Sequence, residues 1–186
     1  TGGLVGYFSY DYVKYSEPNL CLDAEDEEGF RDVDLMLFDK VIAFDNFRQK
    51  IIVIVNARTE QMKKEYERAV EEIDRIIAFI KTGEPPAVLP GKITSEFRNL
   101  FEEEEYCRMV EKAKQYIYEG DIFQVVLSNR MEADFEGSLL NAYRNLRTTN
   151  PSPYMFYFSS DDIEVAGASP ETLVNLENGI CHTFPL

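Results

Sequence analysis

The chain has 186 residues, of which 45% are apolar and 28% are charged. This balance is that of an ordinary globular protein with one large domain or two small ones. With 19 Lys and Arg against 34 Asp and Glu, its formal net charge is −15. Because so acidic a chain repels phosphate backbones and anionic lipid headgroups, we expect neither nucleic acid nor a membrane as partner. No apolar run approaches the roughly 20 residues that a bilayer span needs.

The cysteines and the histidine exclude several kinds of site. Cys21, Cys107 and Cys181 are odd in number and far apart, which fits neither a zinc site nor a disulfide framework. His182 is the single histidine, which argues against Ser-His or Cys-His catalysis and excludes a His-rich metal site. No signal peptide is visible. We therefore expect a cytoplasmic, reducing location.

The first half of the chain predicts strands followed by a helix. Its expected elements are a strand over 3–10, a solvated acidic loop over 16–32, strands over 32–46 and 50–58 that form a hairpin, and an amphipathic helix of about six turns that begins directly after Thr59 and ends before Gly83. The acidic run at 23–28 is interpreted as solvated rather than as a cation site, since consecutive carboxylates repel one another. Thr59 is the expected N-cap of the helix and Gly83 its C′ residue.

The second half predicts a linker and then a mixture of helices and strands. Its expected elements are a Pro-rich linker over 84–98, a helix over 101–119 that ends at Gly120, a strand over 121–135, a short helix over 138–146, and further strands from 163 that turn at Asn178-Gly179. Strands joined by short turns favour antiparallel pairing. The predicted fold class is therefore α+β, with antiparallel β-sheets covered by helices.

Three polar or turn-forming features stand out as candidates for chemistry. Glu171 follows Ser169 and Pro170, a combination that also suits the first turn of a helix. Gln124 lies within an apolar run, and a buried amide there must be hydrogen-bonded to the fold or to a ligand. The segment 150–155, NPSPYM, suits either a rigid turn or the wall of a small apolar pocket. For each of these features, the residues alone leave both a structural and a functional interpretation open.

Taken together, the motifs carry a resemblance. GDIFQVVLSNR at 120–130, NPSPYMFYF at 150–158 and GASPETLV at 167–174 occur in that order, with GGLVGYFSYDY at 2–12 and HTFPL at 182–186. This set resembles the family of chorismate-using enzymes, and within it component I of anthranilate synthase. The resemblance implies a part of that family's α/β sandwich, with 1–95 like its N-terminal region and 96–186 like the first part of the chorismate-binding domain. Both ends break off within strand-like sequence, so we expect a fragment truncated at both ends.

The resemblance also implies roles for individual residues. Relatives that use water as nucleophile carry a lysine at the position of Gln124; an amide cannot act as a general base, which fits the members that use ammonia. Glu171 matches the family's general acid, which helps the ring hydroxyl of chorismate to leave. Pro153, Tyr154 and Met155 match the segment that binds tryptophan as feedback inhibitor, with a prolyl ring and a thioether suited to an indole face.

The remaining expectations concern the whole enzyme. The resemblance implies Mg²⁺ as cofactor, chorismate as substrate and a glutamine amidotransferase subunit as the source of ammonia. The metal-binding glutamates are expected downstream of Leu186, so that this chain holds no metal and is inactive by itself. Two alternatives stay open: aminodeoxychorismate synthase component I, in the 4-aminobenzoate pathway, and a non-catalytic tryptophan-sensing module.

Overall fold

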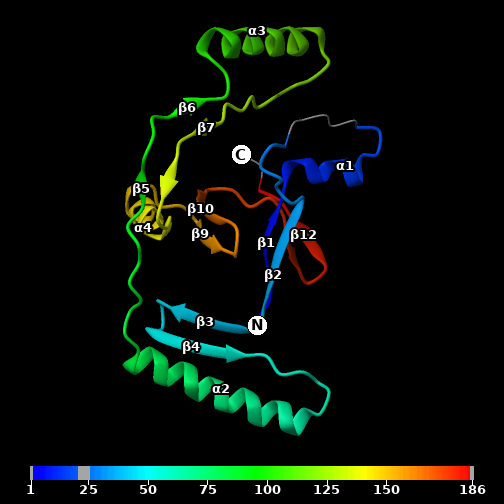
Figure 1. Ribbon diagram of the computed structural model, residues 1–186. Coiled ribbons are helices and arrows are strands. Elements are labelled where there is room, and N and C mark those ends of the chain that lie inside the picture. The colour runs from blue at the N-terminus through cyan, green and yellow to red at the C-terminus, as the bar shows by residue number, and fades with distance from the viewer. Residues whose placement is uncertain (1, 21–25, 185–186) are drawn as a thin grey trace. The chain divides into compact units, whose positions relative to one another are not determined.

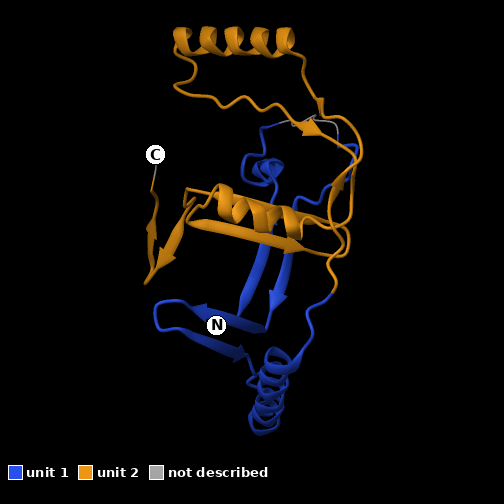
Figure 2. Ribbon diagram, turned by 90° about the vertical axis from the view of Figure 1, so that its left-hand side faces the viewer, with its two compact units in different colours: residues 1–86 blue, residues 87–186 orange. Residues whose placement is uncertain are grey.

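The computed structural model describes residues 2–20 and 26–184, and the chain divides into two compact units, 1–86 and 87–186 (Figure 2). Each unit is considered by itself. Cys21, part of the acidic run at 23–28 and the end of the HTFPL motif lie outside the described residues. The division by packing falls after residue 86; the boundary after residue 95 rests on the resemblance and stays a prediction.

The first unit contains two antiparallel strand pairs and a long helix. Its elements are β1 (Gly3–Phe8), the 3-10 turn η1 (Tyr10–Tyr12), α1 (Val13–Ser16), β2 (Val33–Phe38), β3 (Lys40–Asp45), β4 (Lys50–Val55) and α2 (Met62–Thr82). The run expected to form one long strand breaks at Asp39, since β2 pairs with β1 while β3 pairs with β4. The hairpin expected around 46–49 is confirmed.

Helix α2 packs along β4 (Figure 1). Lys40 Nζ on β3 lies 2.8 Å from Glu72 Oε1 on α2, which joins the helix to the hairpin. The expected N-cap, Thr59, is wrong: the residue before the helix is Gln61, which has a left-handed conformation (φ 53°) and makes no side-chain cap. The helix therefore begins two residues later than an N-cap at Thr59 would place it.

The second unit is built from short antiparallel pairs and two helices. Its elements are β5 (Lys92–Ile93), β6 (Arg98–Asn99), α3 (Glu103–Glu119), β7 (Met131–Glu132), β8 (Phe135–Glu136), α4 (Leu140–Thr149), β9 (Tyr154–Ser159), β10 (Glu164–Ser169), β11 (Asn175–Glu177) and β12 (Ile180–His182). The pairs are β5–β8, β6–β7, β9–β10 and β11–β12. The α+β class with antiparallel sheets is confirmed.

Two expectations about this unit are wrong. The expected linker 84–98 is only partly a linker, because β5 and β6 pair with strands from beyond α3. The expected strand over 121–135 is reduced to β7 and β8, and residues 121–130 form no strand. A strand needs a neighbour for its backbone N–H and C=O groups, and the part of the chain that is described offers none to this segment.

Two predictions that rest on glycines, the end of helix α3 and the last hairpin turn, are confirmed. Helix α3 stops at Gly120, whose left-handed backbone (φ 84°) lets its N–H bond to the carbonyl of Ile117 at 3.2 Å. Asn178 (φ 51°) and Gly179 (φ 79°) form the turn between β11 and β12. Positive φ at both central positions is the pattern of a tight hairpin turn.

The interior of both units is small. Among the described residues, only Ala69 on α2 and Phe158 on β9 are buried. Large apolar side chains such as Phe47 and Phe123 are almost fully exposed. Apolar surface therefore remains open on the strand pairs and on the segment after α3. No described helix is long and apolar enough to span a membrane.

Candidate functional site

The β9–β10 hairpin brings two of the predicted site segments together. In its antiparallel register, Tyr154 lies opposite Ser169 and Met155 opposite Ala168. The end of the NPSPYM motif therefore lies beside the start of the Ser169-Pro170-Glu171 motif. These segments are neighbours because the strands fold back on each other, so the hairpin is the candidate functional site.

The two faces of this hairpin carry different side chains. Met155, Tyr157 and Glu164 share one face, since opposite and alternate residues lie on the same side of a sheet. This face meets α4, where the ring of Tyr143 lies 5.8 Å from that of Tyr157. Tyr154 is on the other face. Adjacent residues of the predicted inhibitor segment thus point to opposite sides of the hairpin.

The Tyr154 face is tightly packed at one point. A Cβ on Gly167 of β10 would lie 2.3 Å from the nearest ring carbon of Phe156 on β9. The aromatic ring therefore lies directly over the glycine, and a larger residue at 167 would displace it. Tyr154, two residues before Phe156, is 47% exposed. Part of its ring is accessible to a ligand.

Glu171 lies on a turn just after β10. The backbone N–H of Glu171 donates to Ser169 Oγ at 3.3 Å, and that hydroxyl lies 3.4 Å from the carbonyl oxygen of Glu171. The hydroxyl of Tyr154 is hydrogen-bonded to Thr172 Oγ1. No helix follows Ser169, so the alternative reading of this motif as a helix cap is wrong. The chain continues to β11 without forming helical bonds, and the Glu171 side chain is exposed.

Glu164 connects the hairpin to the start of α4. Its carboxylate accepts hydrogen bonds from the backbone N–H of Leu139 at 2.6 Å, from Tyr157 at 2.7 Å and from Ser138 at 3.1 Å. These donors, the Leu139 N–H first among them, hold the pKa of Glu164 below its usual value. The charge also lies at a helix N-terminus, where a carboxylate is favoured. We interpret Glu164 as the residue that anchors the hairpin to α4.

Replacing Glu164 with Gln is expected to lower the free energy of unfolding by about 1 kcal/mol at neutral pH, because a charge-assisted cap is lost. Since folding lowers this pKa, the stabilisation is fully present above the ordinary value of 4.5 and disappears as the pH falls through the folded-state value. The gap between wild type and Glu164→Gln should therefore close in acid.

Urea unfolding across a pH series measures that gap, and amide exchange at Leu139 reports on the anchor directly. Glu177→Gln serves as the matched control, because Glu177 is an exposed carboxylate on β11. Equal stability of wild type and Glu164→Gln at neutral pH, or unchanged exchange at Leu139, would contradict the interpretation.

Gln124 lies apart from the hairpin motifs along the chain, between α3 and β7. It is exposed, and the neighbouring Phe123 is fully exposed, so the expectation of a buried amide within an apolar strand is wrong for this structure. The segment is held to α3 by Tyr106, whose hydroxyl donates to the Leu127 carbonyl at 2.9 Å. No hydrogen bond within the described residues joins Gln124 to the hairpin. The catalytic role that the resemblance implies for Gln124 therefore stays a prediction.

The opening motif GGLVGYFSYDY is held in the first unit by contacts to a single carboxylate, that of Asp32. Asp32 accepts from Tyr15 at 2.7 Å and from Ser9 at 3.3 Å, and it forms an ion pair with Lys14 at 2.6 Å. The Lys14 ammonium and the Tyr15 hydroxyl hold the pKa of Asp32 below its usual value. This cluster fastens η1 and α1 to the start of β2, which is a structural role.

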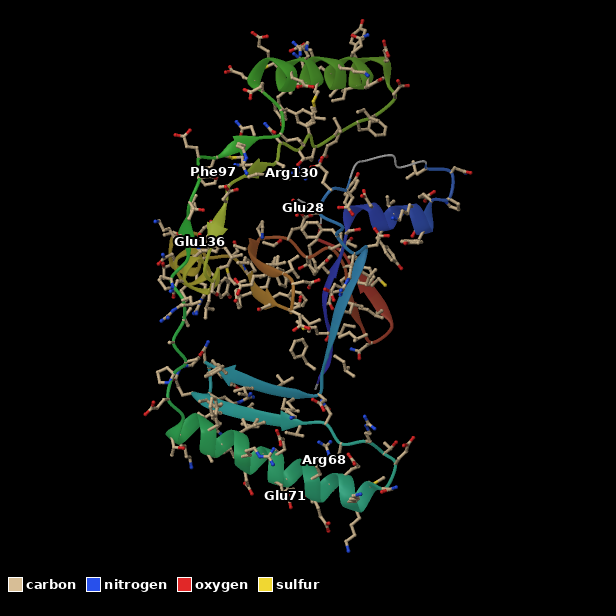
Figure 3. The ribbon with its side chains drawn as sticks, viewed as in Figure 1. Glu28, Arg68, Glu71, Phe97, Arg130 and Glu136 are labelled. Carbon is tan, nitrogen blue, oxygen red and sulfur yellow. The ribbon has the colours of Figure 1, made fainter. Side chains whose placement is uncertain are left out.

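The first unit also contains a cavity of about 530 Å³. Its lining includes Asp39, Asn56, Arg58 and Arg68, the last on α2 (Figure 3). None of the predicted site residues lines it. Among the residues that the structure describes, no three His, Cys, Asp or Glu side chains form a group that could hold a metal ion.

Comparison with known proteins decides the family. The model of a family described as chorismate binding enzyme matches residues 1–186, the whole chain. This chain belongs to that family of chorismate-binding enzymes. The three motifs that carried the resemblance, at 120–130, 150–158 and 167–174, all lie within the matched residues.

Individual relatives within the chorismate-binding enzymes are similar along the entire chain. Anthranilate synthase component 1 of Acetivibrio thermocellus is 40% identical over 193 residues, covering 100% of this chain and 39% of that protein. The Aquifex aeolicus protein of the same name is 41% identical and 38% covered. A crystal structure of anthranilate synthase component I from Streptococcus pneumoniae is 31% identical with a TM-score of 0.81, over 97% of this chain and 41% of that one. The chain thus spans about two-fifths of the length of these relatives.

Sequence reasoning did not single out Glu164 or Thr172. Glu164 had a signal, since it is a charged residue followed directly by the apolar run Val165–Ala168 on a strand. Thr172 had none, because its contact with Tyr154 depends on the strand register. Glu164 lies between the motifs at 150–158 and 167–174, Thr172 lies within the second of them, and both belong to the candidate site.

Proposed function

We propose that this chain is part of an anthranilate synthase component I, which converts chorismate and ammonia to anthranilate and pyruvate in tryptophan biosynthesis. The observation that carries the proposal is the match of relatives with that name along 100% of the chain at 40% identity. The solved structure with the same name supports it at the level of fold.

In the proposed reaction, ammonia adds to the chorismate ring as the ring hydroxyl leaves. Hydroxide is a poor leaving group, so a proton donor is needed at that oxygen, and we assign this role to Glu171. Loss of the pyruvyl side chain as pyruvate then makes the ring aromatic. Gln124 supports the choice of ammonia, because an amide has no proton-accepting state with which to activate water.

Chorismate carries two carboxylates, whereas this chain has a net charge of −15. The substrate must therefore be neutralised locally by Mg²⁺ and basic residues. Following the resemblance, in which the metal-binding glutamates lie downstream of Leu186, the proposal assigns the Mg²⁺ ligands to residues outside this chain. We accordingly expect residues 1–186 alone to be inactive.

Regulation, partner and location complete the proposal. Pro153, Tyr154 and Met155 are assigned to the binding of tryptophan as feedback inhibitor. A glutamine amidotransferase subunit, component II, is assigned as the source of ammonia. The enzyme is proposed to act in the cytoplasm, as the cysteine and histidine usage suggested.

A second candidate is aminodeoxychorismate synthase component I, which uses the same nucleophile but keeps the pyruvyl group. The NPSPYM segment and the names of the relatives favour anthranilate synthase over it. A third candidate is a tryptophan-sensing module without turnover. The products of the reaction separate all three.

The test is to incubate the full-length protein with chorismate, Mg²⁺ and an ammonium salt and to identify products by mass. We expect anthranilate and pyruvate, and none from residues 1–186 alone. An aminated product that keeps its pyruvyl group would identify aminodeoxychorismate synthase. Binding of tryptophan with no product would support the sensing module.

A further inference from the structure

The turn that carries Glu171 is held from both sides by hydroxyl groups. On one side, Ser169 ends β10 and bonds through its hydroxyl to the backbone of Glu171. On the other, Thr172 Oγ1 is hydrogen-bonded to the Tyr154 hydroxyl. Tyr154 starts β9 and lies opposite Ser169 in the register. Tyr154 of β9 is thus hydrogen-bonded to Thr172, the residue that follows Glu171.

The backbone of this turn has little other support. Residues 170–174 belong to neither helix nor strand, so no ladder of backbone hydrogen bonds determines their conformation. Glu171 itself is exposed and its carboxylate has no hydrogen bond or ion pair within the described residues. The direction of its side chain therefore depends on where the two flanking hydroxyl contacts place the backbone.

We propose that Tyr154 and Thr172 are positioning residues that orient Glu171 through their hydrogen bond. The inference rests on the proposed function, in which Glu171 donates the proton. A general acid must lie within about 2.6–3.2 Å of the oxygen that it protonates, and displacement by about 1 Å has large effects on rate. Tyr154 is thus part of the NPSPYM segment, and through its hydrogen bond to Thr172 it also helps to orient Glu171, the proposed general acid.

Variants of the chain separate this role from simple packing. Tyr154→Phe removes the hydroxyl and keeps the ring, and Thr172→Val removes the hydroxyl and keeps the shape. Thr172→Ser restores a hydroxyl at the same place. Tyr118→Phe is the matched control, because Tyr118 is 88% exposed on α3.

The experiment measures kcat and KM of the full-length enzyme with chorismate and an ammonium salt. Tyr154→Phe and Thr172→Val should each lower kcat by about threefold to tenfold, the range expected for one neutral hydrogen bond. KM for chorismate should not change, since the lost interaction serves the transition state. Thr172→Ser and Tyr118→Phe should behave as wild type.

Double variants give the decisive readout. Combining Tyr154→Phe with Thr172→Val should cost no more than either alone, because both remove one bond. In a Glu171→Gln background, Tyr154→Phe should have no further effect on kcat, whereas a general structural role would still lower it. Multiplying effects, or unchanged kcat in either single variant, would overturn the inference. A wild-type enzyme that makes no anthranilate would instead overturn the proposed function.

Discussion

Glu171→Gln is expected to lower kcat for anthranilate formation by about 100-fold or more, the usual contribution of a general acid. Gln keeps the size and the hydrogen-bonding capacity of the side chain but has no proton to release to the leaving hydroxyl. Steady-state rates with saturating chorismate and an ammonium salt measure this effect without the amidotransferase subunit. KM for chorismate should change little, since the interaction is made in the transition state.

The structure allows a clean control for this prediction. Glu171 is exposed on a turn whose hydrogen bonds use its backbone and not its carboxylate, so the substitution should leave stability unchanged. Glu177→Gln on β11 removes another exposed carboxylate of the same unit and should retain full activity. Near-normal turnover by Glu171→Gln would limit Glu171 to a residue of the turn and leave the general acid to be found elsewhere.

Gln124→Lys is expected to divert the reaction from ammonia to water. A lysine amine can act as a general base and activate water, and general-base catalysis contributes on the order of 100-fold or more. The ratio of aminated to hydroxylated product should therefore fall by about tenfold or more. Product ratios by mass spectrometry, at fixed ammonium concentration, measure the change.

Gln124→Met is the comparison variant, because it removes the amide without adding a base. It should lower total turnover without producing hydroxylated product. Since Gln124 is exposed in this structure, neither substitution should destabilise the chain. An unchanged product ratio in Gln124→Lys would show that position 124 does not face the nucleophile, and it would weaken the argument for ammonia.

The two positions differ in how the structure supports them. Glu171 lies on a turn with defined contacts to Ser169 and, through Thr172, to Tyr154. Gln124 lies in a segment without strand pairing, and its assignment rests on the motif at 120–130. A loss of activity at Glu171 together with an unchanged product ratio at Gln124 would thus correct one residue and keep the proposed reaction.

Features that depend on short-range patterns could be predicted from the amino-acid sequence. Helices α2 and α3 follow from apolar residues at every third or fourth position, the end of α3 from Gly120, and the turn between β11 and β12 from Asn178-Gly179. The family followed from the order of three motifs. The N-cap of α2 was wrong because Gln61 adopts a left-handed conformation that no apolar pattern signals.

Contacts between residues far apart in the sequence became known from the folded structure alone. The register of β9 and β10 places Tyr154 opposite Ser169 and within reach of Thr172. It also brings Glu164 to the start of α4. The expected strand over 121–135 failed for the same reason that these contacts could not be foreseen: strand pairing joins residues far apart in sequence, so an apolar run becomes a strand only where another strand satisfies its backbone.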